Sequence, residues 1–139
     1  MVKKPEAVVI GHSLKNNTEG YYNTAIGFQS LYTNTTGDHN LAIGWHALHD
    51  GNASYNIAIG MNSMSGSVTG NYNTALGYRA LQNLTSGTDN MAMGFNSMRN
   101  NTVGLKNTAV GNNSLRFNTT GERNNAIGST ALYYNSEGS

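Results

Sequence analysis

Apolar residues recur along this chain with a period of 16 or 17 residues. A small residue and an aliphatic residue followed by glycine occur eight times, and these glycines lie 16 or 17 positions apart. They are Gly11, Gly27, Gly44, Gly60, Gly77, Gly94, Gly111 and Gly128. Aligned on this glycine, the copies read roughly Asn-Thr-Ala-Ile-Gly-x-x-(Ala/Ser)-Leu-x-x-Asn-Thr-Thr-Gly-x-x. Tandem units of this length indicate a repeat architecture.

Four columns of the alignment are nearly uniform. The residue before the glycine is always large and apolar: Ile10, Ile26, Ile43, Ile59, Leu76, Met93, Val110 and Ile127. A second apolar column lies four positions after the glycine, or three in the first copy: Leu14, Leu31, Leu48, Met64, Leu81, Met98, Leu115 and Leu132. Four positions before the glycine, seven successive copies have asparagine: Asn23, Asn40, Asn56, Asn73, Asn90, Asn107 and Asn124. Two positions before it, Val9 is followed by seven alanines.

This pattern predicts two short strands per copy. The first covers Asn-Thr-Ala-Ile-Gly, as in 23–27, and the second lies around the Ala/Ser-Leu pair, as in 30–31. A second glycine, usually ten positions after the first, marks a turn in which we expect it to supply a positive φ. The fold class is therefore all-β, a parallel β-solenoid or β-roll of eight turns of about 17 residues stacked ~4.8 Å apart. Residues 1–6 form an N-terminal tail and 7–139 the repeat domain, which stops as a ninth unit would begin, as in an excised segment.

Strand alternation predicts which columns face inward. Alanine and glycine share one face of the first strand and the aliphatic column takes the other, so a thin roll with alanine inside leaves the Ile column outside. An exposed stripe of this kind needs a partner. We therefore expect parallel copies of the chain to associate and to bury their Ile columns. The Asn column is expected to pass amide hydrogen bonds from turn to turn.

Composition excludes several other classes of protein. Asn, Gly, Thr and Ser make up 65 of the 139 residues, and only 37% of the residues are hydrophobic. Charged residues amount to 11% and the net charge is +1, which does not fit a highly charged disordered chain. The absence of cysteine excludes a disulfide scaffold. No apolar run is long enough for a membrane span or a secretory signal.

The repeated motif resembles the head repeats of trimeric autotransporter adhesins and of related phage tail-fibre proteins. The resemblance rests on Asn23 to Gly27 and on its variants at 40–44, 73–77 and 107–111, and it covers about 130 residues. It implies a left-handed parallel β-roll, a tight homotrimer and binding to host surfaces. The sequence lacks the signal peptide, coiled-coil stalk and membrane anchor of the adhesins, which favours a virion or injection-particle fibre over a bacterial surface protein.

Few residues suggest chemistry. His12, His39, His46 and His49 do not recur at one spacing, so neither a metal site nor a cofactor is expected. No nucleophile, base and orienting group can be nominated, and we expect no enzyme. Lys106 with Arg123, and Arg99 with Arg116, occupy adjacent turns, but so weak a positive field argues against nucleic acid as a partner. Aromatic residues can either stack on sugars or pack between turns; the candidates for glycan stacking are Tyr22, Tyr55, Tyr72 and Trp45.

The function expected from the sequence is a structural and adhesive segment of a trimeric surface fibre, used by a phage or virus-like particle for host attachment. Its partners would be its own copies, further fibre or virion segments, and a host-surface glycan or protein receptor, without membrane insertion. Two alternatives stay open. One is a monomeric solenoid that binds a lattice such as ice or a glycan, and the other is a subunit of a self-assembling filament. The location would be the virion or the extracellular surface.

Overall fold

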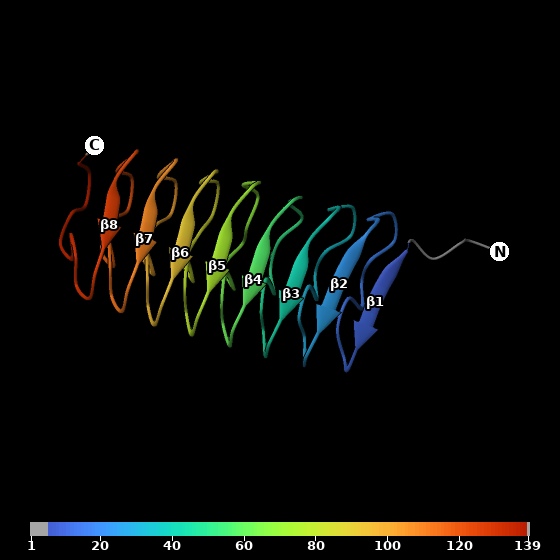
Figure 1. Ribbon diagram of the computed structural model, residues 1–139. Coiled ribbons are helices and arrows are strands. Elements are labelled where there is room, and N and C mark those ends of the chain that lie inside the picture. Colours follow the sequence, from blue (N-terminus) through green and yellow to red (C-terminus); the bar gives the residue numbers. More distant parts are fainter. Residues whose placement is uncertain (1–5, 139) are drawn as a thin grey trace.

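The computed structural model describes residues 6–138 and contains eight short strands that lie side by side in chain order (Figure 1). The strands are β1 (Ala7–Ile10), β2 (Asn23–Ile26), β3 (Leu41–Ile43), β4 (Ile57–Ile59), β5 (Thr74–Leu76), β6 (Met91–Met93), β7 (Thr108–Val110) and β8 (Asn125–Ile127). Every neighbouring pair is parallel. The predicted all-β parallel solenoid is therefore confirmed, with about seven turns between the first and last strands.

The register places each residue beside its equivalent in the next turn. Ala25 pairs with Ala42 and Ile26 with Ile43, and this alignment continues through β8. The seven alanines of the strands are buried almost completely, whereas the residues on either side of them are partly or fully exposed. Opposite the alanines, the Leu and Met side chains of the second apolar column fill the interior from the second turn to the seventh. Each of these turns therefore contributes a small alanine side chain and a large Leu or Met side chain to the core, and these side chains stack along the solenoid.

The second predicted strand is wrong. The segment around the Ala/Ser-Leu pair consists of turns, and its buried leucines adopt left-handed backbone angles, with φ of 47° at Leu31 and at Leu48. These angles turn the chain while keeping its backbone bonded to neighbouring turns. The Leu31 amide donates to the Ala47 carbonyl at 3.1 Å, and the Gln29 amide, also left-handed, donates to the His12 carbonyl at 3.0 Å. The bonds between turns therefore continue outside the sheet without a second strand.

The two glycine columns differ in the reason they require glycine. The glycine that ends each strand has a positive φ, such as 132° at Gly77, which side chains rarely adopt. The turn glycines, expected to supply a positive φ, instead allow close approach between turns. A Cβ atom on Gly70 would lie 1.9 Å from the carbonyl oxygen of Gly87 in the next turn. The expected reason was wrong for the second column, because contact between turns and not chain reversal excludes a side chain there.

The asparagine column forms the hydrogen-bonded ladder that the sequence predicted. The side-chain oxygen of Asn73 accepts from the backbone amide of Asn90 at 3.1 Å and from its Nδ2 at 3.1 Å. The Nδ2 of Asn73 donates to Asn56 Oδ1 at 3.2 Å and to the carbonyl of Gly87 at 2.9 Å. Asn73 is completely buried. The Asn73 amide thus joins its strand start to the turns on both sides of it, and the side chains of Asn90 and Asn107 do the same.

We predict that Gly77→Ala lowers the free energy of unfolding by about 3 kcal/mol or more. A Cβ atom there would lie 2.6 Å from the carbonyl oxygen of Gly94, in addition to the strained φ. Gly128→Ala is the matched control, because Gly128 has a φ of 123° but no atom within 4 Å of the added Cβ. Urea unfolding followed by circular dichroism measures both. Equal effects would show that backbone strain, and not crowding between turns, dominates.

We predict that Asn73→Ala costs about 2–4 kcal/mol of stability, since it leaves buried partners in two neighbouring turns without hydrogen bonds. Asn83→Ala is the control, because Asn83 donates to Asn100 Oδ1 at 2.9 Å from an exposed position. We expect that variant to change the thermal midpoint little. A similar loss in both variants would contradict a special contribution from the buried ladder.

Candidate functional site

The outer face of the sheet carries a continuous apolar column along the described chain. The Ile column projects from it: Ile10, Met93 and Ile127 are 57%, 39% and 77% exposed, and the other five members are partly exposed. The column two positions earlier adds Leu41, which is partly exposed, and the exposed side chains of Ile57 and Met91. Both columns lack aspartate, glutamate, lysine and arginine in all eight strands. The second column also contains Thr24, Thr74, Thr108 and Asn125, so the face is uncharged throughout and continuously apolar along the Ile column.

Large apolar side chains also follow the strand-ending glycines. Phe28, Trp45, Met61 and Phe95 follow those glycines and are about half exposed. The ring of Phe95 stacks on that of Tyr78 in the preceding turn, with centroids 5.3 Å apart. These side chains and the two sheet columns together make what we call the sheet face. The sheet face therefore includes side chains from three columns of the repeat.

The column that precedes the Asn ladder forms a stack of aromatic rings. Tyr22, His39, Tyr55 and Tyr72 have successive centroid distances of 4.9, 4.8 and 5.2 Å. Neighbouring rings thus cover one another's faces, while the side chains stay exposed to solvent. Three of the four candidate glycan-stacking residues belong to this stack. Their ring edges and hydroxyl groups, more than their faces, are presented to a ligand.

Trp45, the fourth candidate, belongs to a different cluster. Its ring lies 3.7 Å from the ring of His46, which in turn lies 4.4 Å from that of His49. The Nδ1 atom of His49 is 2.9 Å from a carboxylate oxygen of Asp50. Burial and the neighbouring His49 hold the pKa of His46 below its usual value, against the opposing effect of Asp50. The structure thus brings together aromatic and titratable side chains from one turn.

The titratable side chains of this cluster are His46, His49 and Asp50. Within residues 6–138 no group of three or more histidine, cysteine, aspartate or glutamate side chains is placed to hold a metal ion. His12 and His39 lie in other turns, where they pack against aromatic rings. The four histidines therefore serve in ring stacking.

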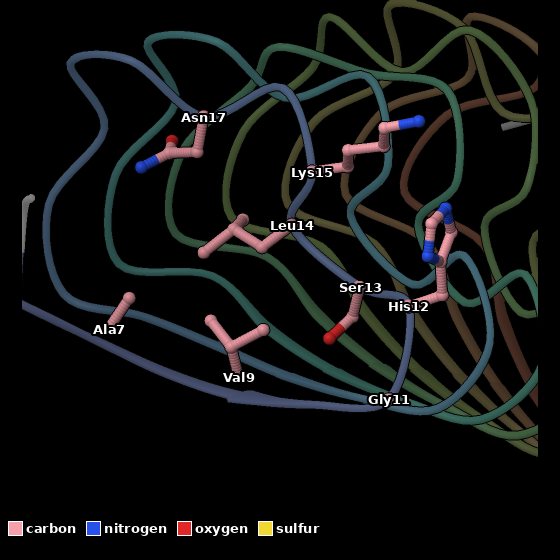
Figure 2. Close-up of a pocket in the computed structure, with 8 residues that line it drawn as sticks. All are labelled: Ala7, Val9, Gly11, His12, Ser13, Leu14, Lys15 and Asn17. Atoms are coloured by element: carbon pink, nitrogen blue, oxygen red, sulfur yellow. The ribbon is translucent and has the colours of Figure 1, made fainter.

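A hollow lies at the β1 end of the solenoid. Figure 2 shows Ala7, Val9, Ser13, Leu14 and their neighbours around a cavity of about 390 Å³. Val9 occupies the column that is alanine in later turns, and it is 48% exposed here because no earlier turn covers it in the described residues. The lining consists mostly of the ends of the inner columns. His12, Ser13 and Lys15 also line the cavity, and the Ser13 hydroxyl donates to the carbonyl oxygens of Ile10 and Ala25 at 3.1 and 2.9 Å.

The threonine column on the turns is regular but internally bonded. The hydroxyl groups of Thr85 and Thr102 donate to carbonyl oxygens of the following turn at 3.0 and 3.1 Å. Thr69 and Thr119 make the same contact. Asn52 interrupts the column and caps three backbone amides of the previous turn. The row of threonines is therefore incomplete, and its hydroxyl hydrogens are used in bonds to the chain's own carbonyl oxygens.

Sequence reasoning missed the contacts between columns that are not adjacent in the alignment. The residues two and five positions after the strand-ending glycine meet on one surface, as shown by Arg116 Nη1 donating to Asn113 Oδ1 at 3.3 Å. This proximity also explains the pairing of His46 with His49. Their spacing of three residues was visible in the sequence. It could not be interpreted as a contact, because that contact depends on a turn conformation that the pattern did not predict.

Comparisons with protein-family models, curated proteins and solved structures found no match. No helix in the described part of the chain is long and apolar enough to cross a membrane.

We predict that nuclear magnetic resonance titration gives His46 a pKa below that of an unfolded-chain histidine, about 6.5. His49→Gln should raise the His46 pKa because it removes a neighbouring positive charge, whereas Asp50→Asn should lower it further. The folded chain binds a proton at His46 less readily than the unfolded chain does. The contribution of His46 to the free energy of unfolding is therefore lost as the pH falls through the pKa of His46 in the unfolded chain. A lower His46 pKa in His49→Gln, or a higher one in Asp50→Asn, would contradict the arrangement of this cluster.

Proposed function

We propose that this chain is a structural and adhesive segment of a trimeric surface fibre, of the phage or virus-like type used in host attachment. The sheet face is the observation that carries the proposal. Its Ile column is apolar in every turn and neither sheet column carries a charge, and isolated soluble domains rarely expose such a stripe over their whole length. Covering it with the same face of parallel copies would bury the Ile column of each chain.

Self-association fits this face better than binding to an unrelated partner. Eight strands at a spacing of ~4.8 Å make a face roughly 34 Å long from β1 to β8. Parallel copies placed in register would bring equal turns together, so that each Ile side chain meets residues of its own column. The number three rests on the resemblance of the Asn-Thr-Ala-Ile-Gly motif to trimeric head repeats. The adhesive role rests on that resemblance and on the exposed aromatic residues.

A lattice-binding monomer is the second candidate, and the threonine column is the observation relevant to it. Its hydroxyl groups donate to the chain's own carbonyls, and Asn52 breaks the rank. Both features weaken the case for a flat surface that orders water. A filament subunit remains the third candidate, since the outermost strands β1 and β8 leave one edge each without a neighbour in the described chain.

We predict that the purified chain has three times the single-chain mass by light scattering, and that Ile59→Asp abolishes this association. The new carboxylate would lie on the sheet face, where burying an unpaired charge costs several kcal/mol. Ser86→Asp is the matched control, because it adds the same charge at an exposed turn position outside that face. Circular dichroism checks that both variants keep the fold.

A single-chain mass for the unmodified protein would reject the trimer and would move the lattice-binding solenoid to first place. A trimer that survives Ile59→Asp would show that another surface holds the copies together. Long rods in electron micrographs would instead favour the filament.

A further inference from the structure

Three of the four arginines lie in three consecutive turns on one surface of the solenoid. Arg79 is two positions after its strand-ending glycine, and Arg99 and Arg116 are five positions after theirs. These two columns adjoin, because Arg116 reaches Asn113 within its own turn. Arg79 and Arg99 are linked through Gln82, which follows Arg79 by three residues and accepts from Arg99 Nε at 2.9 Å. We call these three side chains the arginine surface.

Most of the donor capacity of the arginine surface is unused. Each guanidinium group carries five N–H donors, but within residues 6–138 the hydrogen bonds from these three groups go only to Gln82, Asn113 and the hydroxyl of Tyr133. No carboxylate within residues 6–138 forms an ion pair with any of them. The Nε atoms of Arg79 and Arg116 are buried without a partner in the described chain. The surface is therefore positive and uncompensated.

Aromatic rings hold two of these arginines and border the surface. The guanidinium carbon of Arg79 lies 4.8 Å from the ring centre of Tyr78. That of Arg116 lies 5.3 Å from the ring centre of Phe117 and 5.8 Å from that of Tyr133. Contacts of this length favour a cation over the ring and limit the motion of the side chain. Preorganised guanidinium groups lose less entropy when they bind an anion.

We propose that the arginine surface binds an anionic polysaccharide that carries sulfate groups. Arginine matches the geometry of tetrahedral oxyanions with two parallel N–H donors. Turns ~4.8 Å apart offer successive charges along an extended polymer, and the neighbouring tyrosine and phenylalanine rings offer apolar contacts to sugar rings. Nucleic acid is disfavoured, since three local charges on a chain of net charge +1 make a weak field for a phosphate backbone.

The proposal names a ligand class for the adhesive role proposed above, and it rests on that role only for its biological purpose. Binding by the arginine surface does not require three chains. The mass of every sample is measured by light scattering alongside binding. A trimer without polysaccharide binding would reject this inference alone, and binding by a single-chain species would reject only the trimer.

The test measures binding of short dextran sulfate to the full chain by isothermal titration calorimetry at low and at physiological salt. We expect binding that weakens with salt, and no binding of uncharged dextran. The triple variant Arg79→Gln, Arg99→Gln, Arg116→Gln should weaken binding at least tenfold. Glutamine fits both positions, because Gln29 occupies the Arg79 column with a φ of 54° and Gln82 occupies the column of the other two.

The matched control is Lys15→Gln, Lys106→Gln, Arg123→Gln, which removes three positive charges elsewhere on the chain. We expect less than a threefold effect from it. Equal losses in the two triple variants would show that net charge alone attracts the polymer, and would overturn the proposal. So would no binding of dextran sulfate, no loss in the arginine variant, or tighter binding of a single-stranded oligonucleotide of matched charge. Circular dichroism confirms that each variant is folded.

Discussion

The hydrogen bond from one turn to the next is the interaction on which this structure depends. The strands contribute only three or four residues per turn, yet backbone amides continue to donate to neighbouring turns through the left-handed segments. Leu31 and Gln29 bond in opposite directions along the axis, to Ala47 and His12. Because every residue lies beside its equivalent, a side chain suited to a column in one turn is suited to it in the next. This requirement explains why the sequence repeats.

The repeat allowed the architecture to be predicted from the sequence, because the spacing of the glycines determines the register. The pairing of Ala25 with Ala42 follows directly from the alignment. The left-handed angle of Leu31 could not be predicted in this way, since leucine does not favour that region and its cost is offset by bonds to neighbouring turns. The close contact of Gly70 with the next turn could not be predicted either, because the sequence does not distinguish a glycine needed for its positive φ from one needed for close packing.

Surface features that lie within one strand or one column could be predicted from the sequence, whereas those that depend on turn geometry could not. Alternation along a strand is local, so the outward direction of the Ile column followed from the pattern around Ala25. The ring stack of Tyr22, His39 and Tyr55 lies within one column and followed from the alignment as one of two alternatives. The arginine surface joins two columns, and its existence depends on the turn geometry that placed Arg116 against Asn113.

A scaffold of this kind separates the residues that determine the fold from those free to carry function. Alanine, leucine and asparagine inside the turns repeat almost without change, while the outward columns vary along the axis. The first four turns carry the histidines and most of the exposed tyrosines, and turns five to seven carry the three clustered arginines. Gln29, His46 and Arg79 share one column and nearly the same φ, so the backbone accepts different chemistry there without altering the core. Recognition can therefore differ from one part of the rod to another on a constant framework.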